Sequence, residues 1–351
     1  IRKGIIDAAY FVDAPELLVF GMVASLLAAG TWLLVASYLG WPVSTTHSIV
    51  GAIVGFAAVG VSADAVTWSK VGGIVGSWII TPLISGVFAY MIFMSAQKFI
   101  FNTNDPLANA KRYVPVYMAL AGFILSLVTI KKGLKHIGLH FSTSEAMILS
   151  TVIAVIVGLL GVVAIKRLKV DPAADKKMHY ASVEKVFAIL MVVTACCMAF
   201  AHGSNDVANA IGPLAAVVSI VESGGEIAKK AELVWWILPL GGIGIISGLA
   251  IFGSRVMATI GQGITHLTPS RGFAAELAAA TTVVLASSTG LPISTTQTLV
   301  GAVLGVGMAR GIAALNMGVI RNIVVSWVVT LPAGAALSIC IFYMLKGIFA
   351  A

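Results

Sequence analysis

The stretch GWPVSTTHSIVGA at residues 40–52 returns as GLPISTTQTLVGA at residues 290–302. Eight of the thirteen aligned positions are identical, and the two copies are offset by 250 residues. A repeat this specific predicts that the chain is built from two related halves. In each copy, Gly-x-Pro is followed by Ser-Thr-Thr and then by a short apolar run that contains glycine. Because proline interrupts a helix, we expect a new helix to begin at each Ser-Thr-Thr.

The sequence around both copies is too apolar for a water-soluble fold. Hydrophobic residues make up 59% of the 351 residues and charged residues only 10%, whereas soluble domains have about 45–50% and about 25%. Apolar runs near bilayer-spanning length must be helices, because lipid offers the backbone no hydrogen-bond partners. Such runs lie at 17–38, 71–94, 114–130, 146–165, 183–201, 233–252, 273–286 and 320–345. The sequence therefore predicts an all-α polytopic membrane protein with broken or re-entrant helices at the two copies.

The net charge of +8 comes mostly from lysines and arginines in loops and at the ends of apolar runs. This distribution is typical of a membrane protein and argues against nucleic-acid binding. The loops at 95–112 and 166–185 carry nine of these residues, whereas the loop between them carries three, Lys131, Lys132 and Lys135. The bias predicts that the two richer loops lie in the cytoplasm.

The duplication also divides the chain. We predict a first transmembrane repeat at 1–165, a basic cytoplasmic linker at 166–182 and a second transmembrane repeat at 183–351. Ile1 aligns loosely with Ile260, and a long segment with a polar motif precedes Ile260 in the second repeat. We therefore expect an N-terminal part of the first repeat to be missing from the sequence.

That polar motif is HGSNDVANAIGP at residues 202–213, which lies between apolar runs. On a helix, Asn205 and Asn209 share a face and Asp206 borders it. A carboxylate beside two amides is a plausible set of oxygen ligands for Na⁺, or a group that binds a proton. An ionisable residue inside a membrane is a functional candidate, because its burial costs several kcal/mol unless something compensates. The alternative is a polar contact between helices.

The paired Ser-Thr-Thr segments are candidates for anion binding. A helix start presents unpaired backbone N–H groups and the positive end of the helix dipole, and hydroxyl groups add further donors. Two such starts, one from each half, can hold a small oxyanion from both sides. The candidate residues are Ser44, Thr45, Thr46, Ser294, Thr295 and Thr296. For one copy alone, an ordinary loop with capping residues is the better reading, but two matching copies favour a site.

Glu276 is the other acidic residue placed well inside apolar sequence. It is a candidate ligand for a coupling cation or a proton, and the alternative is an ion pair with Arg271 or Arg255 near the membrane surface. His47 and His202 adjoin the motifs, and we interpret both as hydrogen-bonding supports rather than ligands.

The sequence holds no Walker loop, so ATP does not drive this chain directly, and nothing in it indicates an enzyme or a cofactor. Its apolar segments contain no lysine or arginine placed to neutralise a divalent anion. Bound cations or protons must then offset the charge of an anion, which is a physical reason for symport.

The motif at 202–213, together with the two Ser-Thr-Thr segments, resembles the inorganic phosphate transporter (PiT) family along nearly the whole chain. The resemblance implies a secondary active transporter with two inverted repeats that imports inorganic phosphate with Na⁺ or H⁺ by alternating access. It further implies that the six Ser-Thr-Thr residues hold phosphate and that Asp206 and Asn209 coordinate Na⁺. The residues of the 202–213 motif resemble the Na⁺-coupled members of the family more closely than the proton-coupled permeases for metal–phosphate complexes, which favours Na⁺.

The sequence departs from the family pattern at two places. The first repeat lacks the family's Gly-Ala-Asn-Asp type of motif, and the second copy has Gln297 where the first has His47. The same residues are also compatible with a sulfate permease and, less well, with an ion channel. A bacterial inner membrane is the expected location, and the sequence allows a homodimer that pairs through the spans containing Trp78 and Trp327.

Overall fold

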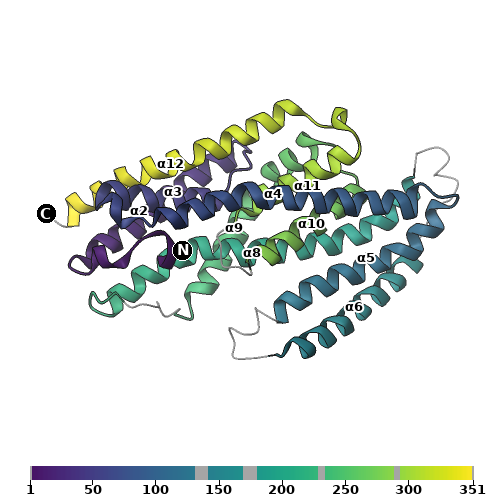
Figure 1. Ribbon diagram of the computed structural model, residues 1–351, viewed down its shortest axis with the longest axis horizontal. Coiled ribbons are helices and arrows are strands. Elements are labelled where there is room, and N and C mark those ends of the chain that lie inside the picture. The colour runs from purple at the N-terminus through teal and green to yellow at the C-terminus, as the bar shows by residue number, and fades with distance from the viewer. Residues whose placement is uncertain (1, 131–140, 169–179, 228–233, 288–292, 350–351) are drawn as a thin grey trace.

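A computed structural model describes residues 2–130, 141–168, 180–227, 234–287 and 293–349. Within these residues the chain is built from helices and turns, and Figure 1 shows the helices as an elongated bundle. The helices are α1 (Arg2–Ile5), α2 (Pro15–Tyr38), α3 (Thr45–Gly60), α4 (Trp68–Ala96), α5 (Pro106–Val128), α6 (Thr143–Lys166), α8 (Ala181–Glu222), α9 (Ile237–Ala258), α10 (Pro269–Ser287), α11 (Thr295–Ala309) and α12 (Met317–Phe349). Short π-helical segments extend α4 and α9, namely η3 (Gln97–Phe101) and η6 (Thr259–Ile264).

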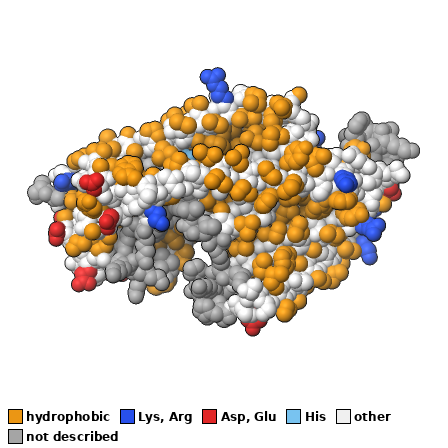
Figure 2. Space-filling model, viewed as in Figure 1, with side chains coloured by type: hydrophobic (Ala, Val, Ile, Leu, Met, Phe, Trp, Pro, Cys, Tyr) orange, Lys and Arg blue, Asp and Glu red, His pale blue; other side chains and the backbone are white. Residues whose placement is uncertain are grey.

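Seven helices among the described residues are long and apolar enough to cross a membrane. Apart from residues 234–236, which precede α9, the described part of each predicted apolar run lies in a helix; residue 233 falls outside the described residues. On the face shown in Figure 2, hydrophobic side chains cover most of the middle, and charged ones gather mainly toward the ends. The expected class, an all-α polytopic membrane protein, is confirmed.

The central helix α8 is longer than the apolar run at 183–201 indicated. It continues without a break through the motif at 202–213 and has Pro213 inside it. The fall in hydropathy at His202 marks a change in polarity rather than an end of the helix. Membrane helices tolerate proline because neighbouring groups satisfy the freed carbonyl.

Two hairpins, α2–α3 and α10–α11, approach the middle of α8 from its opposite ends. At the beginning of α8, Glu184 accepts hydrogen bonds from the backbone N–H and the hydroxyl of Ser270, at the start of α10. Just past the other end of α8, Gly225 lies against Pro15, at the start of α2. In Figure 1 the α2–α3 hairpin accordingly lies toward one end of the molecule and α10–α11 toward the other.

Each short helix packs against the long helix of the other half of the chain. Helix α3 packs on α12, and α11 packs on α4. Glycines make this possible, because a Cβ atom on Gly51 would lie 2.5 Å from the backbone oxygen of Leu331, and one on Gly301 would overlap the backbone of Pro82. The two halves are therefore interlocked through backbone-to-backbone contacts, as small residues allow in membrane proteins.

The two basic loops lie at the same end of the molecule, as their spacing predicted. The ring of Phe101, after α4, contacts the rings of Tyr180 and Phe187, at the start of α8. The predicted linker at 166–182 lies between α6 and α8. Some of the lysines counted for this prediction lie outside the described residues, namely Lys131, Lys132, Lys135, Lys169, Lys176 and Lys177.

The side chains of Trp78 and Trp327 make contacts within the chain, and pairing of two copies through the spans that contain them stays a prediction. Trp78 is 5% exposed and stacks on His47, and the indole N–H of Trp327 donates to the backbone oxygen of Pro42 over 2.9 Å. Both side chains contact residues of the same chain, where the short helices pack closely on α4 and α12.

Candidate functional site

The two Ser-Thr-Thr segments begin helices α3 and α11, as predicted. Ser44 and Ser294 are the N-caps, and each hydroxyl accepts the backbone N–H of the residue three positions on, His47 over 3.1 Å and Gln297 over 3.2 Å. Both serines are extended, with φ of −90° and −96°, which turns the chain into the helix. The hydroxyl of Thr298 donates to the backbone oxygen of Ser294 and tightens the second start.

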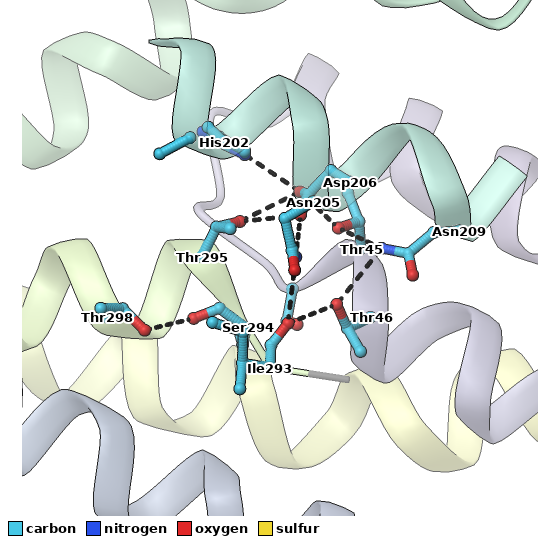
Figure 3. A network of polar contacts seen from close by, with 12 residues as sticks. Thr45, Thr46, His202, Asn205, Asp206, Asn209, Ile293, Ser294, Thr295 and Thr298 are labelled. Atoms are coloured by element: carbon cyan, nitrogen blue, oxygen red, sulfur yellow. Dashed lines mark hydrogen bonds and ion pairs between the residues drawn. The ribbon is translucent and has the colours of Figure 1, made fainter. Parts of the chain in front are cut away.

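Asp206, in the middle of α8, joins the two helix starts. The Thr45 hydroxyl donates to Asp206 Oδ2 over 2.8 Å, and the Thr295 hydroxyl lies 3.1 Å from Oδ1 and 3.0 Å from Oδ2. Figure 3 shows the carboxylate between the two threonines, which come from α3 and α11. Residues 250 positions apart in the sequence thus share one acceptor.

Polar neighbours on α8 complete the network. His202 Nε2 lies 3.0 Å from Asp206 Oδ2, and the Asn205 amide donates to Oδ1 over 2.9 Å. One turn further along, the Asn209 amide donates to the hydroxyls of Thr45 and Thr46 over 3.3 and 3.2 Å. On the helix face that the sequence predicted, Asn209 therefore lies against the start of α3.

The network gathers hydroxyl and amide groups around a largely buried carboxylate. The Asp206 side chain is 9% exposed, whereas that of His202 is 42% exposed. Carboxylate, hydroxyl and amide oxygens suit a hard cation such as Na⁺, and they do not suit a soft transition metal. Each asparagine can present its oxygen instead of its nitrogen by turning its amide through half a turn.

The helix starts also retain donors for an anion. The serine caps satisfy the N–H groups of His47 and Gln297 only, and the earlier N–H groups of an α-helix have no partner within the helix. These groups and the threonine hydroxyls lie beside Asp206. A carboxylate here repels an anion unless a cation neutralises it.

Two of the predicted site residues lie apart from this network. Thr296 is half-buried and makes none of its contacts. Glu276, on α10, accepts a hydrogen bond from the Thr194 hydroxyl over 2.7 Å, rather than pairing with Arg271 or Arg255, which donate to backbone oxygens. Thr194 precedes Asp206 on α8 by twelve residues, about 18 Å along the helix. The structure therefore places Glu276 away from the two helix starts.

The sequence did not identify two other members of the network. The backbone oxygen of Ile293 accepts from the Thr46 hydroxyl over 2.9 Å, and the Asn205 amide nitrogen lies 3.5 Å from it. Ser287, at the end of α10, donates to Asn205 Oδ1 over 3.0 Å. A backbone acceptor leaves no mark in a sequence, whereas Ser287 opens the polar run that leads into the second Ser-Thr-Thr segment.

This combination, two opposed hairpins around a buried carboxylate, defines a helical membrane transporter rather than an enzyme. The phosphate transporter family model matches residues 1–338. The chain belongs to the phosphate transporter family, which confirms the resemblance found in its motifs.

Several known proteins are similar over almost the whole chain. A Haemophilus influenzae protein with a provisional phosphate permease name is 58% identical, over 99% of this chain and 83% of the relative. A Pyrococcus abyssi protein with the same provisional name is 43% identical, over 98% and 83%. A solved structure titled as the sodium-dependent phosphate transporter is 40% identical, with a TM-score of 0.87 over 99% of this chain and 84% of that one.

Proposed function

We propose that this protein imports inorganic phosphate by Na⁺ symport through alternating access, in the inner membrane of a bacterium. One observation carries the proposal: Asp206 accepts hydroxyl hydrogen bonds from the starts of both α3 and α11. One carboxylate is thereby linked to both halves of a candidate anion site. The family membership and the sodium-dependent neighbour support the same reading.

In the proposed cation site, Asp206 and Asn209 bind Na⁺, and Asn205 is a further oxygen ligand. A threonine hydroxyl that gives a lone pair to Na⁺ turns its proton away from the carboxylate. That proton is then available to a phosphate oxygen. Na⁺ binding thus converts Thr45 and Thr295 from donors to Asp206 into donors to phosphate.

Charge makes this coupling strong. Phosphate beside an ionised and buried Asp206 would face Coulomb repulsion at low effective dielectric. A bound Na⁺ replaces the repulsion with attraction, so phosphate binds well only after the cation. In this scheme phosphate lies between Ser44, Thr45 and Thr46 on one side and Ser294, Thr295 and Thr296 on the other.

Alternating access follows from the opposed hairpins. Their starts meet at α8, and each short helix packs on a helix of the other half. Tilting one hairpin against the other opens the meeting point toward one end of the molecule and closes it toward the other. In the proposed orientation, the end with the basic loops at 95–112 and 166–185 faces the cytoplasm, and the halves act as inverted repeats.

Uptake of labelled phosphate by proteoliposomes, with and without an inward Na⁺ gradient, tests the proposal. We expect saturable accumulation that requires the Na⁺ gradient. Uptake that is independent of Na⁺ and follows a pH gradient would identify an H⁺-coupled transporter, of phosphate or of metal–phosphate. Preferential accumulation of sulfate would identify a sulfate permease. Conductance without saturable accumulation would identify a channel.

Glu276 is proposed as a second cation position, because it lies inside the bundle with a hydroxyl partner and, among the described residues, no basic one. Glu276→Gln should raise the Na⁺ concentration for half-maximal uptake and leave the KM for phosphate at saturating Na⁺ nearly unchanged. An equal rise in both constants would place Glu276 outside the cation pathway.

A further inference from the structure

His47 and Gln297 occupy the same position in the two copies of the duplicated segment, offset by 250 residues. Each is the third residue after its serine cap, and each side chain is buried, with exposures of 3% and 5%. The helix starts that carry them are in contact, because the Thr46 hydroxyl donates to the backbone oxygen of Ile293. A buried polar side chain thus stands on each side of the contact between the two starts.

Two tryptophans fix the position of the His47 ring. The imidazole stacks on Trp78 of α4, with ring centroids 3.6 Å apart and an angle of 33° between the planes. Its Nδ1 lies 3.5 Å from the backbone oxygen of Trp327 in α12. His47 is therefore held by helices from both halves of the chain.

One buried polar atom of each side chain lacks a hydrogen-bond partner within the part of the chain that the structure describes. Neither His47 Nε2 nor Gln297 Oε1 makes a hydrogen bond to any described residue, although the Gln297 side chain interacts with the His47 ring. Leaving both atoms unpaired at this burial would carry a free-energy cost. A contact between the two side chains removes that cost.

The chemistry of the ring decides how that contact is made. The Trp327 oxygen can only accept, so the proton of a neutral imidazole belongs on Nδ1, and Nε2 is then an acceptor. The partner of Nε2 must be a donor. Gln297 supplies one when its amide presents nitrogen to the ring, an orientation related by half a turn to the one that presents oxygen.

We propose that Gln297 donates its amide N–H to His47 Nε2, and that this pair positions the starts of α3 and α11 for phosphate binding. The pair joins the two halves directly, beside Thr45 and Thr295, which both contact Asp206. The pair also explains why the two copies differ here, with histidine in the first copy and glutamine in the second. His47 is fixed by Trp78 and Trp327, whereas glutamine can turn its amide to supply the missing donor.

Transport kinetics test the pair through His47→Leu, Gln297→Leu and the double variant. This test rests on the proposed function, so wild-type uptake is measured in parallel. Each single variant should raise the KM for phosphate roughly threefold to tenfold, the range that one neutral hydrogen bond supports. The double variant should be no worse than the more affected single variant, because both remove the same bond. The maximal rate per folded protein should change less than the KM.

Ser85→Ala is the matched control, since it removes a buried hydroxyl on α4 that has no partner among the described residues. It should leave the KM unchanged. Effects of the two single variants that multiply in the double variant, or an unchanged KM in Gln297→Leu, would overturn the proposal.

A readout without transport separates this proposal from the proposed function. In protein labelled with nitrogen isotope at its six histidines, the His47 signals are assigned by their loss in His47→Leu. We expect a neutral ring with the proton on Nδ1, and a shift of the Nε2 resonance in Gln297→Leu but not in Ser85→Ala. Identical His47 spectra in wild type and Gln297→Leu would overturn the pair. Wild-type protein without phosphate uptake but with the expected spectra would overturn only the proposed function.

Discussion

Helices α3 and α11 begin with the same three residues, yet they hold the central carboxylate differently. At α3, Thr45 donates to Asp206, while Thr46 donates to Ile293, and both hydroxyls accept from Asn209. At α11, Thr295 contacts both oxygens of Asp206, and Thr296 lies outside the network.

The two starts make different hydrogen bonds because a single helix, α8, contacts both of them with different sets of residues. Its Asn209 donates to the threonine hydroxyls of α3, whereas no amide among the described residues donates to those of α11. The duplicated sequence therefore supplies matching threonine hydroxyls, and the residues of α8 determine which hydrogen bonds this helix makes with each pair of hydroxyls. Four sets of substitutions test whether this difference between the two starts matters for transport and stability.

The largest effect is expected for Asp206→Asn, because both helix starts lose their shared charged acceptor. Hydrogen bonds to a charged group contribute about 1.5–3 kcal/mol each, so Na⁺-driven phosphate uptake should fall by about 100-fold or more. Initial rates in proteoliposomes, normalised to folded protein, measure the loss. Asp206→Asn with wild-type dependence on Na⁺ would show that the carboxylate does not bind the cation.

A smaller and unequal loss is expected for Thr295→Val and Thr45→Val. Removing a donor to a charged group should cost about 10-fold to 100-fold in uptake. Thr295 should be the more sensitive residue because it contacts both carboxylate oxygens. The corresponding serine variants keep the hydroxyl and serve as controls. If Thr45→Val is the more damaging change, the structural difference between the starts does not govern transport.

The interlocked packing is tested by Gly51→Ala on α3 and Gly301→Ala on α11. In both places the added methyl group meets the backbone of the other half, and overpacking of this kind costs about 1–3 kcal/mol. Thermal unfolding in detergent should shift to lower temperature for both variants by similar amounts. Gly248→Ala, on α9, is the control because nothing lies within 4 Å of the added atom. A stable Gly301→Ala would indicate looser packing of α11 than of α3.

The smallest effect is expected for Thr296→Ala. The loss of the Thr296 hydroxyl removes one proposed neutral hydrogen bond to phosphate, so the KM for phosphate should rise by about threefold. Because Thr296 makes no contact with the Asp206 network, the Na⁺ affinity should stay unchanged. Ser247→Ala, on α9, is the control, since that exposed hydroxyl donates to the backbone oxygen of Ile243 in its own helix. A change in Na⁺ affinity in Thr296→Ala would place Thr296 in the cation site.

Much of the site was predictable because its signals are local. Proline followed by Ser-Thr-Thr marks a helix start wherever it occurs, and a buried acid beside asparagines marks a polar face of a helix. The candidates Asp206, Asn209, Thr45 and Thr295 came from such signals, and the structure places them in contact. Their roles in binding Na⁺ and phosphate stay predictions.

Other features depend on the arrangement of helices and leave no local signal. Nothing near Glu276 in sequence shows that its partner is Thr194, roughly three helical turns along α8 from Asp206. Nothing in the sequence shows that Trp78 stacks on His47 or that Trp327 donates to the backbone oxygen of Pro42. The backbone oxygen of Ile293 is an acceptor that no residue type encodes.

Hydropathy and a close repetition of residue types are properties of the chain alone, and they identify a helical membrane protein of two related halves. That the two Ser-Thr-Thr starts meet at one carboxylate, with one start bound to Asn209 and the other not, becomes visible only in the packed helices. The physical reason is that α8 crosses between the hairpins as a single asymmetric helix. Which hydroxyl reaches Asp206 therefore depends on how the helices pack.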